Sequence, residues 1–228
     1  MDNLLMLHGA IGSSVQLEPL AEFLTDTYKV YLLNFSGHGG KQIPKEKFSI
    51  EMFADDVLYF IDRNKLKGIN IYGYSMGGYV ALYIARHFPE KINKIFTTAT
   101  KFDWTEETSL KESHLLNPEN ISEKLPKFAE QLIERHSPEN WKIVLSKTAE
   151  MMIDLGKSQS LNDEDFSTIE NEVLLSVGDR DNMVSIEETV DVYRNLKNGN
   201  LLIFPDTPHP IEKISPVRLA NEIKLFFK

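Results

Sequence analysis

Ser75 stands between two glycines in the run Gly-Tyr-Ser-Met-Gly-Gly at residues 73–78, directly after the apolar segment 69–72. The pattern Gly-x-Ser-x-Gly is typical of a sharp turn between a strand and a helix that exposes a nucleophilic hydroxyl. The neighbours two positions away must lack side chains, or the strand and the helix would collide. The first N–H groups of the helix are unpaired and can bind an anion. A glycine-rich turn without a catalytic role is the alternative.

A serine hydroxyl becomes a strong nucleophile only when a base removes its proton. That base is usually a histidine oriented by a carboxylate. Ligand sites in open parallel sheets lie beyond the carboxyl ends of the strands, so both groups are expected directly after apolar runs. Asp179 and Asp181 follow the run 172–177, and His209 follows the run 200–204. The alternatives are a solvated Asp- and Asn-rich turn for the carboxylates and a surface position for the histidine.

Short apolar runs alternate with amphipathic stretches along most of the chain. This pattern predicts an α/β fold, because strands that are almost continuously apolar and are separated by helices are typical of a mostly parallel sheet covered by helices on both faces. Pro89 would end the helix that follows Ser75. Strands are predicted at 4–7, 28–33, 69–72, 94–98, 172–177 and 200–204, and helices at 15–24, 50–61, 76–88, 186–196 and 217–227.

Residues 101–165 contain no convincing strand. We expect them to form a helical cap, or lid, inserted after the fourth strand of a single domain that spans residues 1–228. A helix is predicted to begin at the cap residue Ser137, with Pro138 in its first turn, and to end near Leu155 at Gly156. A second helix would cover 121–135, with a kink at Pro126. The alternative is that these helices belong to the layers that cover the sheet.

Along the chain, the elbow serine comes first, then the acid, then the histidine. In this order the chain resembles the α/β-hydrolase fold superfamily, and the resemblance covers nearly the whole chain. It implies a catalytic triad of Ser75, Asp181 and His209. Gly178 and Val184 stand where the family has them around its acid. They favour Asp181 as the acid, with Asp179 as the rival.

The segment Leu-His-Gly-Ala at 7–10 is similar to the family's His-Gly-x loop after the first strand. The resemblance implies an oxyanion hole made by the backbone N–H groups of Ala10 and Met76, which would stabilise a tetrahedral intermediate. His8 would serve the structure of the loop, and a glycine-containing turn is the alternative for the whole motif.

Several positions depart from the family pattern. Pro208 replaces the glycine that often precedes the histidine, and Asn34 replaces an acid after the second strand. The usual N-terminal hairpin is missing, which leaves six strands in the order 2-1-3-4-5-6. The strand 28–33 would then be an edge, and exposed edges are usually protected. We therefore expect another segment or a second subunit to cover it; a light-scattering mass of one chain would exclude the dimer.

The resemblance implies a serine hydrolase, similar to carboxylesterases and haloperoxidases, that cleaves a small or medium carboxylic ester through an acyl-enzyme. A thioesterase, a carbon–carbon bond hydrolase or a lyase would use the same triad. The elbow resembles that of a menaquinone-pathway synthase, but Tyr79 stands where that family has arginine. A receptor with low turnover is an alternative of another class. Candidates for the lining of an acyl pocket, or for a small core of the cap, are Phe102, Trp104, Leu115, Leu116, Met151 and Met152.

The composition restricts the partners. The net charge of −9 among 228 residues argues against a nucleic-acid groove and against anionic membranes. The chain has no cysteine, which excludes disulfides and thiolate metal sites and fits a reducing, cytoplasmic location. No segment approaches the length of a membrane span, and no signal peptide is apparent. We expect a monomer or homodimer that acts on a small molecule and needs no cofactor or metal.

Overall fold

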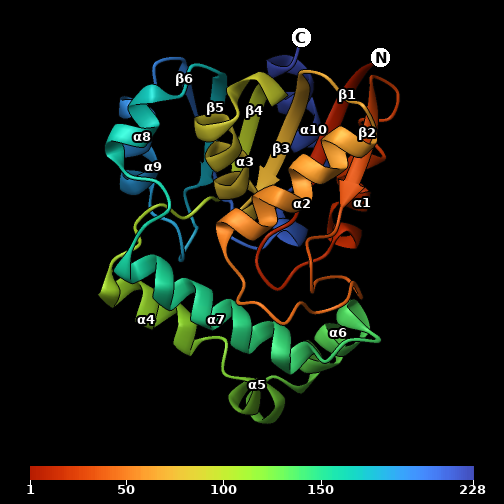
Figure 1. Ribbon diagram of the computed structural model, residues 1–228, viewed down its shortest axis with the longest axis vertical. Coiled ribbons are helices and arrows are strands. Elements are labelled where there is room, and N and C mark those ends of the chain that lie inside the picture. The colour runs from red at the N-terminus through yellow and green to blue at the C-terminus, as the bar shows by residue number, and fades with distance from the viewer.

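Six apolar runs pair into one parallel sheet in the computed structural model, which describes residues 1–228 (Figure 1). The strand order is β2-β1-β3-β4-β5-β6, so β2 and β6 form the two edges. The predicted α/β class, the six parallel strands and their order are confirmed. The bounds are β1 (Asp2–Leu7), β2 (Tyr28–Leu33), β3 (Ile69–Tyr74), β4 (Ile92–Thr98), β5 (Glu172–Gly178) and β6 (Gly199–Phe204).

Helices cover both faces of this sheet (Figure 1). The face that carries Leu5 and Leu7 packs against α2 (Ile50–Arg63), α3 (Met76–His87) and α9 (Ile186–Asn195). The face that carries Leu4 and Met6 packs against α1 (Glu18–Ala21) and α10 (Pro216–Phe226). Short 3₁₀ turns complete the layers: η1 (Ser14–Leu17), η2 (Pro89–Lys91) and η3 (Ile211–Lys213).

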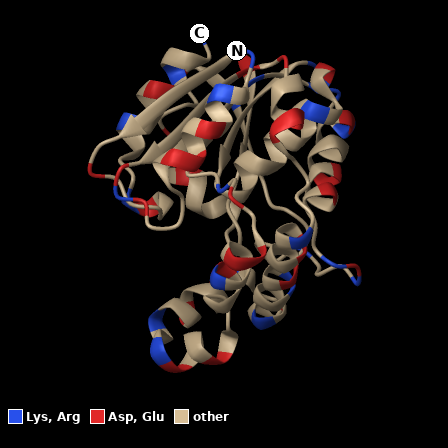
Figure 2. Cartoon of the chain, turned by 90° about the vertical axis from the view of Figure 1, so that its left-hand side faces the viewer, with Lys and Arg blue, Asp and Glu red and all other residues tan.

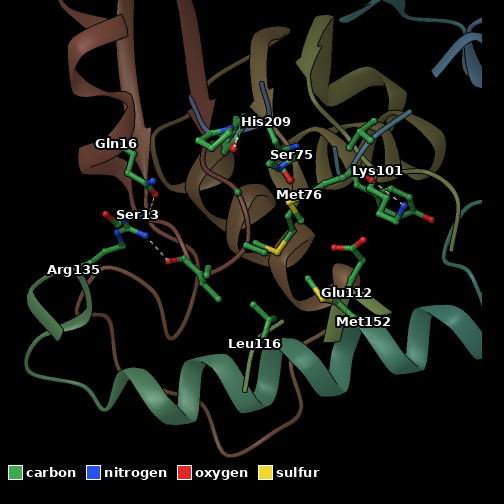
Figure 3. Close-up of a pocket in the computed structure, with 18 of the residues that line it drawn as sticks. Ser13, Gln16, Ser75, Met76, Lys101, Glu112, Leu116, Arg135, Met152 and His209 are labelled. Atoms are coloured by element: carbon green, nitrogen blue, oxygen red, sulfur yellow. Dashed lines mark hydrogen bonds between the residues drawn. The ribbon is translucent and has the colours of Figure 1, made fainter. Parts of the chain in front are cut away.

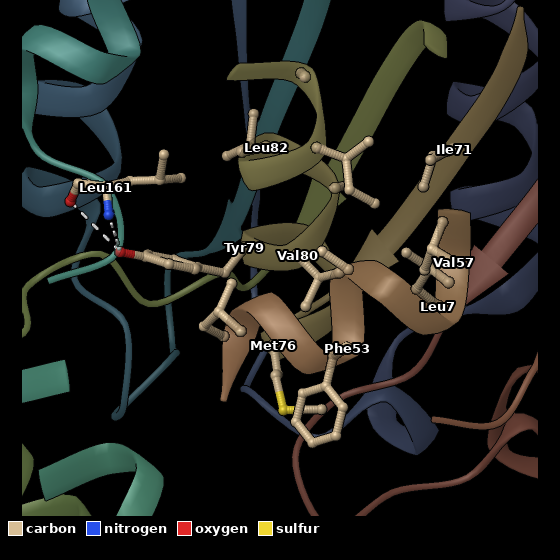
Figure 4. Packing of buried hydrophobic residues seen from close by; sticks show 14 of the residues in the cluster. Leu7, Phe53, Val57, Ile71, Met76, Tyr79, Val80, Leu82 and Leu161 are labelled. Carbon is tan, nitrogen blue, oxygen red and sulfur yellow. Dashed lines mark hydrogen bonds between the residues drawn. The ribbon is translucent and has the colours of Figure 1, made fainter. Parts of the chain in front are cut away.

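The continuous apolar runs follow from this double coverage. Successive side chains of a strand point to opposite faces, and here both faces are dry. The four residues from Leu4 to Leu7 are all fully buried. Figure 4 shows Leu7 and Ile71 packed against Val57 and Val80, from α2 and α3. This packing fixes β1 and β3, whose carboxyl ends carry the predicted oxyanion loop and the elbow.

Between β4 and β5 the chain forms five helices and no strand. Most of them make a layer that lies across the carboxyl ends of the strands in Figure 1, and Figure 2 shows charged residues of both signs interspersed along it. The last, α8, packs against α3 and α9 instead. The bounds are α4 (Glu106–His114), α5 (Pro118–Lys124), α6 (Pro126–His136), α7 (Trp141–Lys157) and α8 (Asp163–Thr168).

Several predicted helix boundaries are wrong. Leu125, with ψ of 55°, separates α5 from α6, because the residue before a proline is pushed out of the helical region. Asn140, not Ser137, caps α7: its side chain accepts a hydrogen bond from the N–H of Lys142 at 3.0 Å. The predicted helix 15–24 is only η1 and α1. The helices α4 and α8 were not predicted.

Gly156 lies inside α7 and does not end it. A Cβ atom at this position would lie 2.6 Å from Cβ of Ser109 and 2.7 Å from the carbonyl oxygen of Thr105. The glycine therefore allows α4 and α7 to pack closely, which a prediction based on helix termini could not reveal.

Gly156→Ala is expected to destabilise the protein although alanine is the better helix former. The added methyl group overpacks the contact between α4 and α7, and such overpacking costs about 1–3 kcal/mol of unfolding free energy. Urea unfolding measures this cost. Ser146→Ala, at an exposed position of the same helix, is the control and should change stability by no more than about 0.5 kcal/mol. Equal stability of the two variants would contradict the packing argument.

Candidate active site

Ser75 occupies a strained turn between β3 and α3. Its φ of 50° and ψ of −117° are rare for a residue with a side chain. Two hydrogen bonds hold the turn: the N–H of Ser75 donates to the carbonyl of Thr98 at 2.8 Å, and the hydroxyl of Thr100 donates to the carbonyl of Ser75 at 3.1 Å. The side chain of Ser75 itself is half-buried and faces a cavity (Figure 3).

The two glycines of the elbow permit close backbone contacts. A Cβ atom on Gly73 would lie 2.5 Å from Cα of Gly78, and one on Gly77 would lie 2.5 Å from the carbonyl oxygen of Leu7. Side chains at these positions would push the helix away from the strand and from β1. The steric reason inferred from the spacing therefore agrees with the contacts.

The structure pairs His209 with Asp181. Nδ1 of His209 lies 2.8 Å from Oδ2 of Asp181, whose side chain is fully buried. The other carboxylate oxygen accepts hydrogen bonds from the N–H groups of Met183 and Val184, both at 2.9 Å. Since a carboxylate only accepts, Nδ1 carries a proton, and in the neutral imidazole Nε2 has the free lone pair. The hydroxyl of Tyr74 donates to the carbonyl of His209 at 3.0 Å and helps to hold the loop.

Ser75 and His209 line the same cavity, and Figure 3 shows them beside each other at its upper wall. The structure contains no hydrogen bond between the two side chains; catalytic hydrogen bonds are often long before substrate binds. Asp179, the rival acid, accepts instead from the N–H of Thr207 at 3.2 Å and makes no hydrogen bond with the imidazole. This hydrogen bond ties the loop after β5 to the loop that carries His209.

The backbone N–H groups of Ala10 and Met76, both residues of the cavity wall, have no acceptor in the protein. Met76 is the first residue of α3, so its N–H is one of the unpaired donors of a helix N-terminus. Ala10 follows β1 and lies in the loop that contains His8. Both N–H groups are therefore free to donate to a ligand.

A cluster of three buried histidines supports the loop after β1. The ring centroid of His38 lies 5.3 Å from that of His8 and 5.8 Å from that of His136. Nδ1 of His8 donates to the carbonyl of Gly9 at 2.8 Å, and Nε2 of His136 lies 3.1 Å from the carbonyl of Ile11. The expected structural role of His8 matches these contacts, whereas the sequence did not indicate His38 or His136 as its partners.

Burial keeps these histidines neutral. It lowers the pKa of His8 to about 3 and that of His136 to about 4, and it also lowers the pKa of His38. In an unfolded chain each would titrate near 6.5. Below that pH the unfolded state binds more protons than the folded state, so stability falls as the pH falls.

We expect the free energy of unfolding to decrease between pH 6.5 and pH 5 by up to about 1.4 kcal/mol per pH unit for each buried histidine. Urea unfolding at several pH values measures the slope. His136→Asn should reduce this slope by about the contribution of one histidine. His87→Asn, at an exposed position, is the matched control and should leave it unchanged. A wild-type stability that is constant from pH 6.5 to pH 5 would contradict the neutral cluster.

The cavity between the sheet and the helices α4, α6 and α7 has a volume of about 1020 Å³. More than half of its lining residues are hydrophobic, as in many small-molecule sites. Among the six pocket candidates, Trp104, Leu116, Met151 and Met152 line it. Phe102 packs against Tyr79 and Phe166 in the core instead. Leu115 is exposed.

Polar side chains that the sequence did not single out also line this cavity. Lys101 and Glu112 lie at one end of the cavity, and Gln16 and Arg135 lie at the other (Figure 3). Each comes from a loop or helix whose contact with the sheet no local pattern indicated. The side chains of the protein form no cluster of three His, Asp or Glu suited to a metal ion. No helix combines the length and hydropathy of a membrane span.

Comparisons with known proteins agree with this fold. Among curated relatives, 3-oxoadipate enol-lactonase 2 of Acinetobacter baylyi is 26% identical over 42% of this chain and 36% of its own length. Pimeloyl-[acyl-carrier protein] methyl ester esterase of Neisseria meningitidis is 33% identical over 42% of this chain and 35% of its own length. The alignments thus span about a third of these relatives.

A solved structure of a thermophilic esterase from Thermogutta terrifontis has the same fold. It superposes with a TM-score of 0.79 at 20% identity, over 100% of this chain and 89% of the other. The family model described as alpha/beta hydrolase fold matches residues 2–149, well over half of the chain. With its parallel sheet, elbow and order of elements, the chain belongs to the alpha/beta hydrolase fold family.

Proposed function

We propose that this protein is a serine hydrolase that cleaves a small or medium carboxylic ester through a triad of Ser75, His209 and Asp181. The observation that carries the proposal is the Nδ1–Oδ2 contact of 2.8 Å between His209 and Asp181, on the wall of the cavity that also exposes Ser75. An apolar cavity of about 1020 Å³ suits the acyl and alkyl parts of such an ester.

In the first half of the reaction, Oγ of Ser75 attacks the ester carbonyl while Nε2 of His209 takes its proton. The carbonyl oxygen becomes an oxyanion, which the N–H groups of Ala10 and Met76 stabilise. Asp181 holds the imidazole in the required tautomer and stabilises its charged form. The tetrahedral intermediate then expels the alcohol, which takes the proton from His209, and Ser75 is left acylated.

In the second half, water attacks the acyl-enzyme and gives one proton to Nε2 of His209. Collapse of the second intermediate returns that proton to Ser75 and releases the carboxylic acid. No redox or metal step is required. Arg135 and Lys101 also line the cavity, and the proposed proton transfers do not use them.

The relatives support ester chemistry without deciding the substrate. Two of them are by name a lactonase and a methyl ester esterase, and both kinds of enzyme open a carboxylic ester. A thioester would fit the same sequence of steps, because only the leaving atom changes. We therefore propose the ester as the substrate class and treat the thioester as a competing outcome of the test.

The test combines labelling with turnover. A fluorophosphonate probe should modify Ser75, as located by peptide mass spectrometry, and p-nitrophenyl esters of acetate, butyrate and octanoate should be hydrolysed over many turnovers. The matching acyl thioesters are assayed in parallel. Labelling at Ser75 with stoichiometric but no repeated hydrolysis would favour the low-turnover receptor. No labelling and no hydrolysis would contradict the proposal.

A further inference from the structure

Glu112 carries a carboxylate that is buried in the cavity without a partner. The residue lies on α4 and is only 3% exposed. Its Oε2 atom has no hydrogen-bond partner. Figure 3 shows the side chain pointing from the cap into the cavity, beside Met152. A buried carboxylate without partners is costly, so such groups are normally paired or bind a ligand.

Three cations line the cavity; Lys213 makes no ion pair with Glu112, and the other two are engaged elsewhere. Nζ of Lys101 lies 3.8 Å from a carboxylate oxygen of Glu188, and it also donates to the carbonyl of Met183. The guanidinium of Arg135 donates to the carbonyl of Ile11 at 3.1 Å and lies 3.9 Å from Glu212. Neither side chain neutralises Glu112.

The surroundings of Glu112 restrict the chemistry of a ligand. Leu116, Met152 and Met76 line the same cavity and supply apolar surface, whereas Nζ of Lys101 already lies over the ring of Trp104, 5.9 Å from its centroid. Aliphatic surface favours a hydrocarbon chain, while a carboxylate attracts a cation. A protonated amine at the end of an apolar chain suits both kinds of group.

We propose that Glu112 binds a primary ammonium group carried by an apolar chain of the substrate. This inference rests on the proposed function in one respect: it takes the occupant of the cavity to be the ester on which Ser75 acts. The substrate would then be an ester whose acyl or alkyl chain ends in an amine, oriented by the cap while its carbonyl lies at Ser75.

Binding of n-hexylammonium and of 1-hexanol tests the proposal without any turnover. The two probes have the same chain, and at pH 7.5 the amine is protonated because its pKa is about 10, as for lysine. Isothermal titration calorimetry on the wild-type protein should give at least about tenfold tighter binding for the ammonium, as expected for a charge-assisted hydrogen bond. Equal affinities would overturn the proposal.

Variants then assign the preference to one side chain. Glu112→Gln should remove the preference for the ammonium while leaving 1-hexanol binding within about twofold. Glu107→Gln makes the same charge change at an exposed position of α4, so it should retain the preference. A preference that survives in Glu112→Gln would overturn the assignment. Thermal unfolding of each variant shows whether it is folded. If Glu112→Gln does not fold, the comparison of n-hexylammonium with 1-hexanol on the wild-type protein still decides the proposal.

Failure of this proposal is distinguishable from failure of the proposed function. Ammonium binding that depends on Glu112, in a protein that hydrolyses no ester or thioester, would support the binding site and contradict the hydrolase. Hydrolysis of p-nitrophenyl esters with no ammonium preference would support the hydrolase and contradict the binding site.

Discussion

Replacing Ser75 with alanine is expected to lower kcat for p-nitrophenyl butyrate by about 10⁶-fold, the largest effect of any single change considered for this protein. Loss of a catalytic serine removes the nucleophile, the acyl-enzyme and the proton transfer to His209 together, and in serine hydrolases it costs about that factor. The alanine keeps the Cβ atom at a φ of 50°, so the strain of the turn is unchanged. Initial rates at saturating ester measure the effect.

Two controls make this result specific to the hydroxyl group. Ser75→Ala should unfold at the wild-type temperature, because the serine hydroxyl makes no hydrogen bond in the structure. Ser122→Ala, at an exposed position of α5, should retain full activity. Ester hydrolysis at the wild-type rate by Ser75→Ala would refute the catalytic role of this residue and leave only the fold assignment standing.

Strands were more predictable from the sequence than helices, and packing explains why. Both faces of the sheet are covered by helices, so β1 has to be continuously apolar. Such a run can be recognised in the sequence without knowing which segments pack against it. The helices α4, α6 and α7 bury only one narrow side. The helix α4 was missed because most of its residues are polar, and its place depends on Gly156 of α7, a contact between segments far apart in the chain.

The candidate site divides in the same way. Ser75, the two acids and His209 each follow an apolar run. Because the strands are parallel, these residues were predicted to lie together at the carboxyl ends of the strands. The family spacing around Gly178 and Val184 favoured Asp181 over Asp179, and the side-chain directions show that Asp181 is the carboxylate that meets the imidazole. The positions of Glu112 and of the histidine cluster depend on which loops and helices contact one another above the sheet. No local sequence pattern predicts those contacts.

Asp181→Asn is expected to lower kcat by about 10⁴-fold with little change in KM. The amide would keep one oxygen for the N–H groups of Met183 and Val184. Its NH₂ group would then face Nδ1 of His209, and an NH₂ donor favours the tautomer in which Nδ1 accepts and Nε2 carries the proton. In that tautomer Nε2 cannot take the proton of Ser75, and such a change costs about 10⁴ in known triads.

Asp179→Asn is the matched control, because it makes the same substitution two residues away in the same loop. Its oxygen can still accept from the N–H of Thr207, so activity should stay within a few-fold of wild type. The reverse ranking of the two variants would make Asp179 the acid. The double variant Ser75→Ala/Asp181→Asn should be no slower than Ser75→Ala alone, because residues that act as one unit are not additive. An additive loss would show that Asp181 affects hydrolysis by a route other than His209 and Ser75.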